Sequence, residues 1–498
     1  MQSRLGDAAN NDATARQHRV APPKFSTPAT EECSCVGSGR LRCGMAFKSR
    51  RRFLTDAAAA AGATLAAPLE ALARRAHTGD REPVSGLGPL SPTRDEVTGL
   101  ALLDLPPGFR YRSLAWTGDA MESGTRTPGA PDGMAAFAGD DGVVYLIRNH
   151  ELSSGAAFAP TLAYDGAAGG GTTTLTISAD GNLLGARASL AGTVRNCAGG
   201  PTPWRSWLTC EESVLGPATP GGGLEKPHGY VFDVPVDGTP TRLPLTAMGR
   251  FVHEAVAVDP RSGIVYETED ARRAGLYRFT PKTPGRLADG GRLQMLAVRG
   301  RPRLDLRTAQ PAGVRYGVYW VDIAEPDRAH ETQAAADGGG VFAQGYAAGA
   351  AIFARLEGAW YADGRVFVTS TDGGHARMGQ LWALDIDRQE LSLVFESPGA
   401  EVLNMPDNVT VSPRGGLVLC EDGTANPCVH GLTPDGRLFR LARNAVRLAG
   451  ERNGIAGDFT SSEFAGATFS PDGRWLFVNV QTPGITFAIT GPWEEGGI

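Results

Sequence analysis

Short apolar runs alternate with polar positions from about residue 100 to the end of the chain. In four places an alternating run is followed by a Gly-containing turn and a second run that ends in polar residues. Alternation with a period of two predicts half-buried β-strands, here joined as hairpins. The four copies span residues 253–270, 356–372, 406–422 and 464–479.

The residues that open these copies fall in register. Glu254, Glu357 and Asp407 share one position, and Ala465 occupies it in the fourth copy. Residues 141–151 and 204–212 resemble the second strand alone, which raises the total to about six units. The turns or runs begin roughly 50 to 60 residues apart, except for one gap of about 100 that predicts an insertion over 281–350.

Repeats of this kind predict an all-β fold, namely a six-bladed β-propeller with an insertion between repeats. Residues 276–281 and 380–385 supply further strands, so each unit has the three or four strands of a blade. Closing the ring removes exposed strand edges. The alternative is a β-sandwich with long loops, but a sandwich does not repeat an acidic strand opening in register.

Composition supports a chain with many tight turns. The 66 Gly and 34 Pro recur between the apolar runs, which favours the all-β interpretation. The net charge is −6, with 48 Lys+Arg against 54 Asp+Glu. Because this balance is mildly acidic, a nucleic-acid partner is not expected.

An export signal is predicted near the N-terminus. Arg50, Arg51 and Arg52 precede an apolar stretch from Ala57 to Pro68, and Ala71-Leu72-Ala73 has the small-residue pattern of a cleavage site. The order is that of a twin-arginine signal. The domain boundaries that follow are 1–44 (a non-native extension or disordered segment), 45–73 (signal peptide), 74–98 (linker) and 99–498 (propeller).

Carboxylates at one register position predict a metal site. Equivalent positions of successive blades converge on the propeller axis, where carboxylates repel one another unless a cation lies among them. Glu, Asp and Asn oxygens suit Ca²⁺ or Mg²⁺, whereas a thiolate indicates a softer metal such as iron or zinc. Cys210, followed directly by Glu211, offers both kinds of ligand from one strand end.

Other polar groups are weaker candidates. The pairs Glu269-Asp270 and Glu421-Asp422 end the second strands and are either additional calcium ligands or exposed loop acids. His253 precedes Glu254 and either orients it, transfers protons or packs in a turn. Cys420 and Cys428 are candidates for a disulfide, whose connectivity sequence does not settle.

Several motifs together resemble the PhoX-type alkaline phosphatases. They are Asn196-Cys-Ala-Gly-Gly200, Trp207-Leu-Thr-Cys-Glu-Glu212, His228-Gly229, His253-Glu254 and Pro406-Asp407-Asn408. The resemblance covers nearly the whole chain after residue 100. It implies twin-arginine export, a six-bladed propeller and a phosphomonoesterase with iron and calcium ions in its mouth.

The resemblance also implies roles for individual residues. Cys210, Glu211, Glu254, Glu357 and Asp407 correspond to metal ligands, with Asn408 beside them. Arg355 corresponds to the phosphate-binding arginine of an Arg-x-Glu element, although Leu356 stands where the family pattern has Pro.

The expected function is therefore that of an exported phosphatase acting on a small phosphate ester. Its partners are the twin-arginine translocase during export and its substrate, and the mature chain is expected to be a periplasmic or secreted monomer without a membrane anchor. Two alternatives remain open: a single-calcium propeller lactonase or esterase, and a noncatalytic propeller braced by calcium.

Overall fold

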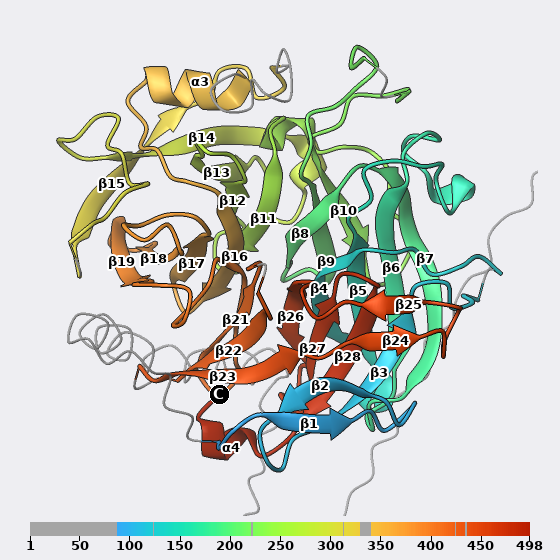
Figure 1. Cartoon of the computed structure of the whole chain (residues 1–498). Coiled ribbons are helices and arrows are strands. Elements are labelled where there is room, and N and C mark those ends of the chain that lie inside the picture. The colour runs from blue at the N-terminus through green and yellow to red at the C-terminus, as the bar shows by residue number, and fades with distance from the viewer. Residues whose placement is uncertain are drawn as a thin grey trace, which may run out of the picture. The chain divides into compact units, whose positions relative to one another are not determined.

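The structure is a computed structural model that describes residues 87–498, except 123, 221–222, 312, 329–339, 424 and 434–435. The predicted extension, signal peptide and most of the predicted linker lie outside these residues. Almost all regular structure in the described part is antiparallel β-sheet (Figure 1).

Six antiparallel units follow one another along the chain. The first three are β4 (Pro131–Ala138), β5 (Val144–His150), β6 (Gly170–Ile177) and β7 (Leu183–Thr193); β8 (Asn196–Pro201), β9 (Ser206–Glu211) and β10 (Val231–Pro235); β11 (His253–Val258), β12 (Val265–Glu269), β13 (Leu276–Pro281) and β14 (Gly291–Val298). The next two are β16 (Leu356–Ala362), β17 (Arg365–Ser370), β18 (Gln380–Asp385) and β19 (Glu390–Glu396); β20 (Pro406–Val411), β21 (Leu417–Glu421), β22 (Cys428–Leu432) and β23 (Leu438–Asn444). The last unit contains β26 (Phe464–Phe469), β27 (Leu476–Val480), β28 (Ile485–Thr490) and β3 (Arg110–Trp116).

The first strands of these units form a closed ring. Each of β4, β8, β11, β16, β20 and β26 contacts the first strand of the next unit, and β26 contacts β4. The later strands of each unit lie progressively farther from the centre (Figure 1). This is the arrangement of a β-propeller, so the predicted fold class is confirmed.

The ring is closed by strands from opposite ends of the described chain. β3 completes the sheet of β26, β27 and β28 by pairing with β28, for example Tyr111 with Ile489. β2 (Ala101–Leu105) pairs with β23, and β1 (Ser91–Arg94) covers β2. The predicted linker over 74–98 therefore contains a strand, where the Tyr111 hydroxyl donates to the Thr93 carbonyl at 3.1 Å.

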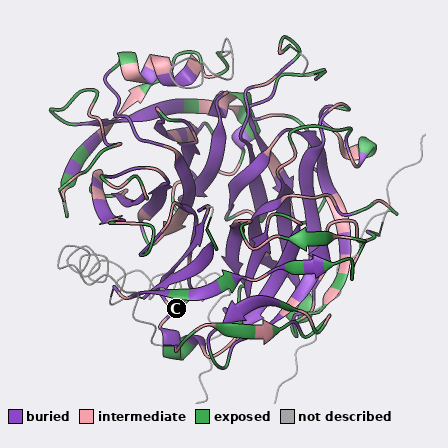
Figure 2. Ribbon diagram, in the orientation of Figure 1, coloured by how far each residue is buried: buried purple, intermediate pink, exposed green. Residues whose placement is uncertain are grey.

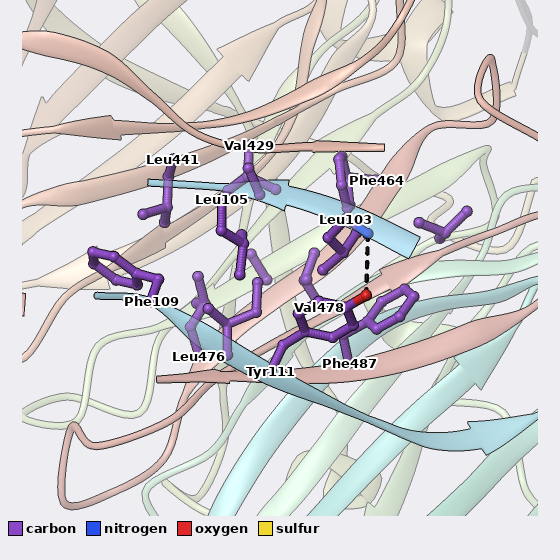
Figure 3. Packing of buried hydrophobic residues seen from close by; sticks show 14 of the residues in the cluster. Leu103, Leu105, Phe109, Tyr111, Val429, Leu441, Phe464, Leu476, Val478 and Phe487 are labelled. Atoms are coloured by element: carbon purple, nitrogen blue, oxygen red, sulfur yellow. Dashed lines mark hydrogen bonds between the residues drawn. The ribbon is translucent and has the colours of Figure 1, made fainter. Parts of the chain in front are cut away.

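The seam between these strands is a continuous apolar core. Figure 3 shows Leu103 and Leu105 packed over Tyr111 and among residues from the fifth and sixth units. The core residues of this seam are buried, and the strands around the centre are buried as well (Figure 2). Each fully buried Leu or Phe here contributes about 1.5–3 kcal/mol relative to exposure, so the seam holds both ends of the propeller together.

The predicted insertion begins later than expected. Residues 291–298 form β14, the regular fourth strand of the third unit, and the additional segment starts after it. It contains β15 (Arg315–Asp322), which pairs with β14 and β19 and merges two units into a nine-stranded sheet. The sequence pattern of β14 was missed because its polar start, Gly291-Arg292, reads as part of a turn.

Short elements complete the described structure. A two-stranded ribbon joins β24 (Arg447–Ala449) and β25 (Ala456–Asp458), and the helices are α3 (Gly340–Ala347) and α4 (Trp493–Gly496). Single 3-10 turns span Asp140–Gly142, Pro160–Leu162, Thr246–Met248 and Leu287–Asp289. None of the described helices is long and apolar enough to cross a membrane.

Candidate metal centre and active site

All six units share one backbone geometry where the first strand meets the second. The residue after each second strand donates its backbone N–H to the residue just before the first strand, at 2.8–3.3 Å. The donors are Glu151, Glu212, Asp270, Thr371, Asp422 and Gln481, and the acceptors are Ala130, Arg195, Val252, Arg355, Met405 and Glu463. This repeated bond shows which residues of the six units are structurally equivalent.

A β-bulge follows in every first strand. The strand pairing shifts by one residue directly after the start of β4, β8, β11, β16, β20 and β26. Bulges bend a strand and redirect a side chain. At the bulge the six units carry Asp132, Cys197, Glu254, Glu357, Asp407 and Ala465, which we call the inner ring.

The side chains of the inner ring meet. Oxygens of Glu254, Glu357 and Asp407 lie within 4.8 Å of one another, and the Cys197 sulfur lies within the same distance of oxygens of Glu254 and Glu212. All five polar side chains of the ring are buried. The predicted convergence of Glu254, Glu357 and Asp407 on the axis is therefore what the structure contains.

A second layer, in which four of the six residues are acids, directly follows the second strands. These residues, Glu151, Glu212, Asp270, Thr371, Asp422 and Gln481, are called the outer ring. The Gln481 amide donates to Asp132 at 3.0 Å and to Glu151 at 2.6 Å, so it links the two rings. The sixth unit has no polar side chain in the inner ring, because Ala465 occupies that position. Glu463, which precedes β26, gives this unit a carboxyl group instead.

Two arginines occupy equivalent positions in the second and fourth units. Both precede a first strand, and both have left-handed backbone, with φ of 51° for Arg195 and 42° for Arg355. Arg195 binds Glu151 at 2.9 Å and Glu212 at 2.6 Å. Arg355 binds Asp270 at 3.0 Å and Glu357 at 2.5 Å. Each arginine therefore bridges its own unit and the preceding one.

Each guanidinium group keeps one nitrogen without a partner among the described residues. The described contacts of both arginines use Nε and Nη2, which leaves Nη1 unengaged within the described residues. The two side chains are 31% and 27% exposed, whereas Glu357 is 4% exposed. The arginines thus form the solvent-facing rim of a buried acidic centre.

Burial and mutual repulsion control the protonation of the rings. Burial raises the pKa of Glu254 well above its usual range, and the neighbouring Glu357 raises it further. The pKa of Asp407 is raised by burial and then by Glu254. Burial, followed by Glu151, raises the pKa of Asp132.

The centre fits a cation. Two like charges 4.8 Å apart repel by about 3.5 kcal/mol at an effective dielectric constant of about 20. Both oxygens of Glu254 and one each of Asp132 and Asp407 are buried without a hydrogen-bond partner in the described structure. Such oxygens are costly unless an ion or a proton satisfies them. The donors are carboxylates with one thiol, a set that suits hard and soft metal ions together.

The thiol that lies among these carboxylates belongs to Cys197, and the structure does not bring the predicted Cys210 into this group. Cys210 packs in an apolar cluster with Leu208, Val231 and Phe251 and belongs to no described group of metal-ligating side chains. Successive side chains of a strand point to opposite faces. Cys210 lies inside β9, whereas Cys197 lies at the bulge of β8, where the side chain turns to the axis.

Glu211 is likewise structural. Its carboxylate accepts hydrogen bonds from Val194 N at 2.9 Å, Gly229 N at 2.8 Å, Tyr230 N at 3.2 Å and His228 Nδ1 at 2.6 Å. These donors fill its lone pairs, so Glu211 holds the surrounding loops. Glu212, the next residue, carries the acid into the outer ring.

The other two strand-end pairs divide in the same way. Glu269 accepts from Gly275 N and the Tyr277 hydroxyl, each at 2.8 Å. Glu421 accepts from Asn404 N at 2.8 Å and Cys428 N at 2.9 Å. Asp270 and Asp422 lie at the rings beside Arg355. The first acid of each pair therefore lies outside the two rings, and the second belongs to them.

His253 and Asn408 lie apart from the ligand set. The His253 ring stacks on Phe251 with centroids 3.6 Å apart, and burial lowers its pKa to about 3. It packs in the core and is not placed for proton transfer at the rings. Asn408 lines a cavity of about 10 Å³ with Gly133, Gly199 and Gly358, next to the inner ring.

The sequence prediction also missed site residues in the first two units. Asp132, Cys197 and Arg195 belong to first strands that begin Pro131-Asp-Gly and Asn196-Cys-Ala-Gly-Gly. Gly and Pro at a strand start indicate a turn, so these strands were not recognised. The detectable signal was an Asp or Cys 9 to 12 residues before the start of the second strand, where the other units carry their acid 8 to 11 residues before it.

All four described cysteines are free thiols. Cys420 pairs with Val429 across β21 and β22, so its side chain and that of Cys428 point to opposite faces of the sheet. The candidate disulfide between Cys420 and Cys428 is therefore not formed.

Comparisons with known proteins agree with this architecture. A family model described as alkaline phosphatase PhoX matches residues 85–186 and 170–484. The structure of Pseudomonas fluorescens PhoX in complex with vanadate, a transition-state analogue, superposes with a TM-score of 0.61 at 18% identity, covering 83% of this chain and 99% of that chain. A gluconolactonase of Xanthomonas campestris gives a TM-score of 0.37 at 16% identity, with 82% and 99% covered. No curated protein sequence matches the chain.

Proposed function

The chain belongs to the alkaline phosphatase PhoX family, a family of phosphomonoesterases, and from this we propose that its two rings form an iron and calcium site that hydrolyses phosphate monoesters. The observation that carries the proposal is the buried inner ring, in which carboxylate oxygens without hydrogen-bond partners surround one thiol. Neither feature is explained by folding alone, because both reduce the stability of a metal-free protein.

Cys197, Glu254, Glu357 and Asp407 are the proposed ligands of the inner ring, joined by Asp132 and Glu212. The thiol suits iron, and the carboxylates suit calcium as well as iron. Bound cations at such a site polarise a phosphoryl group and supply an activated oxygen nucleophile at neutral pH. Arg195 and Arg355 offset part of the negative charge in the metal-free protein.

The two arginines are proposed to bind the phosphoryl oxygens. Arg355 corresponds to the phosphate-binding arginine of the family pattern, and Arg195 is its structural equivalent two units away. A guanidinium group pairs with phosphate through parallel N–H donors. Because carboxylates fix Nε and Nη2 of each arginine, Nη1 is held in place for an anion that enters the mouth.

The rings contain no side chain suited to be a serine-type nucleophile. Thr371 is the hydroxyl residue of the outer ring, and its Oγ1 donates to the Pro406 carbonyl at 2.9 Å. A covalent hydroxyl mechanism would also need a base next to it, and His253 is stacked in the core. The attacking oxygen is therefore proposed to come from solvent.

The test uses protein purified after native export. Metal analysis and hydrolysis of p-nitrophenyl phosphate, each with and without a chelator, are expected to show bound iron and calcium and chelator-sensitive turnover. Protein without these metals and without such turnover would contradict the proposal. Turnover of a lactone instead, insensitive to Cys197→Ser, would favour the lactonase alternative, and stabilisation by calcium without any turnover would favour the noncatalytic one.

Export is part of the proposal. The Arg50-Arg51-Arg52 segment, the apolar stretch and the small-residue cleavage pattern support passage through the twin-arginine translocase to the periplasm or beyond. We expect the mature protein to act as a monomer. Fusion of residues 45–73 to a reporter, compared with a fusion in which the arginines are replaced by Lys, tests the route.

A further inference from the structure

We propose that the hairpin of β21 and β22 carries a separate zinc site formed by Glu421, Cys428 and His430. One possible ligand atom from each side chain lies within 4.8 Å of the other two. All three residues are buried. The site is independent of the ring centre, since none of the three residues belongs to the inner or outer ring.

Strand geometry brings the three side chains together. Cys428 and His430 are two residues apart on β22, so they point to the same face of the sheet. Cys420 pairs with Val429, which places Glu421 opposite Cys428, and Cys428 N donates to Glu421 Oε2 at 2.9 Å. A single hairpin therefore presents sulfur, nitrogen and oxygen ligands on one face.

The polar atoms of His430 indicate a missing partner. The side chain is fully buried, and Nε2 lies 2.9 Å from Glu421 Oε1 but outside hydrogen-bond geometry. Nδ1 has no hydrogen-bond partner among the described residues either. A buried imidazole whose Nδ1 has no partner among the described residues, and whose Nε2 has only a poorly oriented carboxylate beside it, is destabilising, and a metal ion next to the glutamate would use one of the two nitrogens.

A histidine also contacts the acid that ends the second strand of the second unit, but it comes from the loop before β10, since by strand register Phe232 corresponds to His430. There His228 lies between two carboxylates, with Nδ1 2.6 Å from Glu211 and Nε2 3.3 Å from Asp165. Both ring nitrogens are used, and no thiol is present. In the fifth unit the second carboxylate is absent from the described contacts of His430, and Cys428 contributes a thiol instead.

The donor set and its surroundings favour zinc. Thiolate, imidazole and carboxylate are the usual zinc ligands, and three protein ligands leave a fourth position for water. A cavity of about 450 Å³ reaches Glu421 and Cys428 and is also lined by Asn404, Arg440 and Arg443. The cavity provides access for the ion and room for the fourth ligand.

Cobalt(II) replaces zinc as a spectroscopic probe, because a cobalt–thiolate bond absorbs in the near ultraviolet. Full-length exported protein would be stripped with a chelator and titrated with cobalt(II). The probe is applied to Cys197→Ser, which removes the thiol of the ring centre, and to the double variant Cys197→Ser/Cys428→Ser. Cys420→Ser on the adjacent strand is the matched control, because its thiol faces away from the cluster.

In Cys197→Ser we expect the absorption band of a cobalt–thiolate bond. The band should saturate at about one cobalt ion per chain. The band should persist when Cys420→Ser is added and disappear with Cys428→Ser, and zinc should compete with cobalt for the site. His430→Gln should weaken binding while leaving the metal-free melting temperature similar. If Cys197→Ser folds poorly, the same difference is measured between the otherwise unchanged protein and Cys428→Ser alone.

Two results would overturn the site. One is a folded Cys197→Ser protein that gives no thiolate band, and the other is a band that survives in the double variant. Neither depends on phosphatase activity, so the zinc site and the proposed function fail or hold separately. Cys428→Ser is expected to retain phosphomonoester hydrolysis.

Discussion

Replacement of Cys197 and of Cys210 by serine distinguishes a proposed metal ligand from a core residue. The two thiols are both buried and only thirteen positions apart in the sequence, yet their neighbours differ. Cys197 lies near carboxylates of the rings, whereas Cys210 packs among apolar side chains. The same chemical change should therefore have opposite consequences.

For Cys210→Ser we expect a loss of stability with little loss of function. The new hydroxyl is buried in an apolar cluster, and an unsatisfied buried hydroxyl costs about 1–3 kcal/mol in proteins. The melting temperature should fall by a few degrees, while iron content and specific activity per folded molecule remain close to those of the unchanged protein. For Cys197→Ser we expect loss of iron and a fall in kcat/KM of about 100-fold or more, since even residues that only support a metal ligand matter about 10- to 100-fold.

The assay compares both variants after native export, with metal content, kcat/KM for p-nitrophenyl phosphate and melting temperature measured on the same preparations. Melting with a chelator isolates the contribution of the polypeptide. In the presence of the chelator, Cys197→Ser should have a melting temperature close to that of the unchanged protein. Neither protein then holds a metal ion whose contacts the substitution could remove. Retained iron and activity in Cys197→Ser, together with their loss in a folded Cys210→Ser, would refute the assignment of the ring thiol.

Three further predictions concern charge. Arg195→Lys and Arg355→Lys should each raise KM for the phosphomonoester and weaken inhibition by inorganic phosphate by roughly 10-fold, because lysine cannot reproduce the bidentate fork. The metal content should not change. An unchanged KM in Arg195→Lys would contradict the role of Arg195. Metal-free protein should lose stability as pH rises, because the folded state holds the proton of Glu254 above the pKa of the unfolded chain. Melting temperatures measured from pH 4 to 8 with a chelator should show this slope, and Glu254→Gln should flatten it; an equal slope in the variant would contradict the cause. Glu211→Gln should lower the free energy of unfolding by about 1–3 kcal/mol, because the side chain loses hydrogen-bond acceptors. The bound metal should stay in place. Denaturation and metal analysis of the same sample measure the two effects.

The repeat in the sequence was enough to predict the architecture. Hairpins with a shared turn and a shared acidic opening cannot bury their faces alone, and a ring of such units is the arrangement that removes their edges. The same register placed Glu254, Glu357 and Asp407 around one axis. These inferences succeeded because they depend on periodicity, which the sequence contains directly.

Which of two neighbouring polar residues faces the site was decided only by the tertiary structure. Adjacent residues of a strand point to opposite sides, and a one-residue bulge reverses the assignment. For this reason Glu212, and not the adjacent Glu211, reaches the rings, whereas the thiol near them comes from Cys197 on the neighbouring strand β8 and not from Cys210 on β9. Arg195 became recognisable as the counterpart of Arg355 only when the backbone hydrogen bonds between strands defined equivalent positions in all six units.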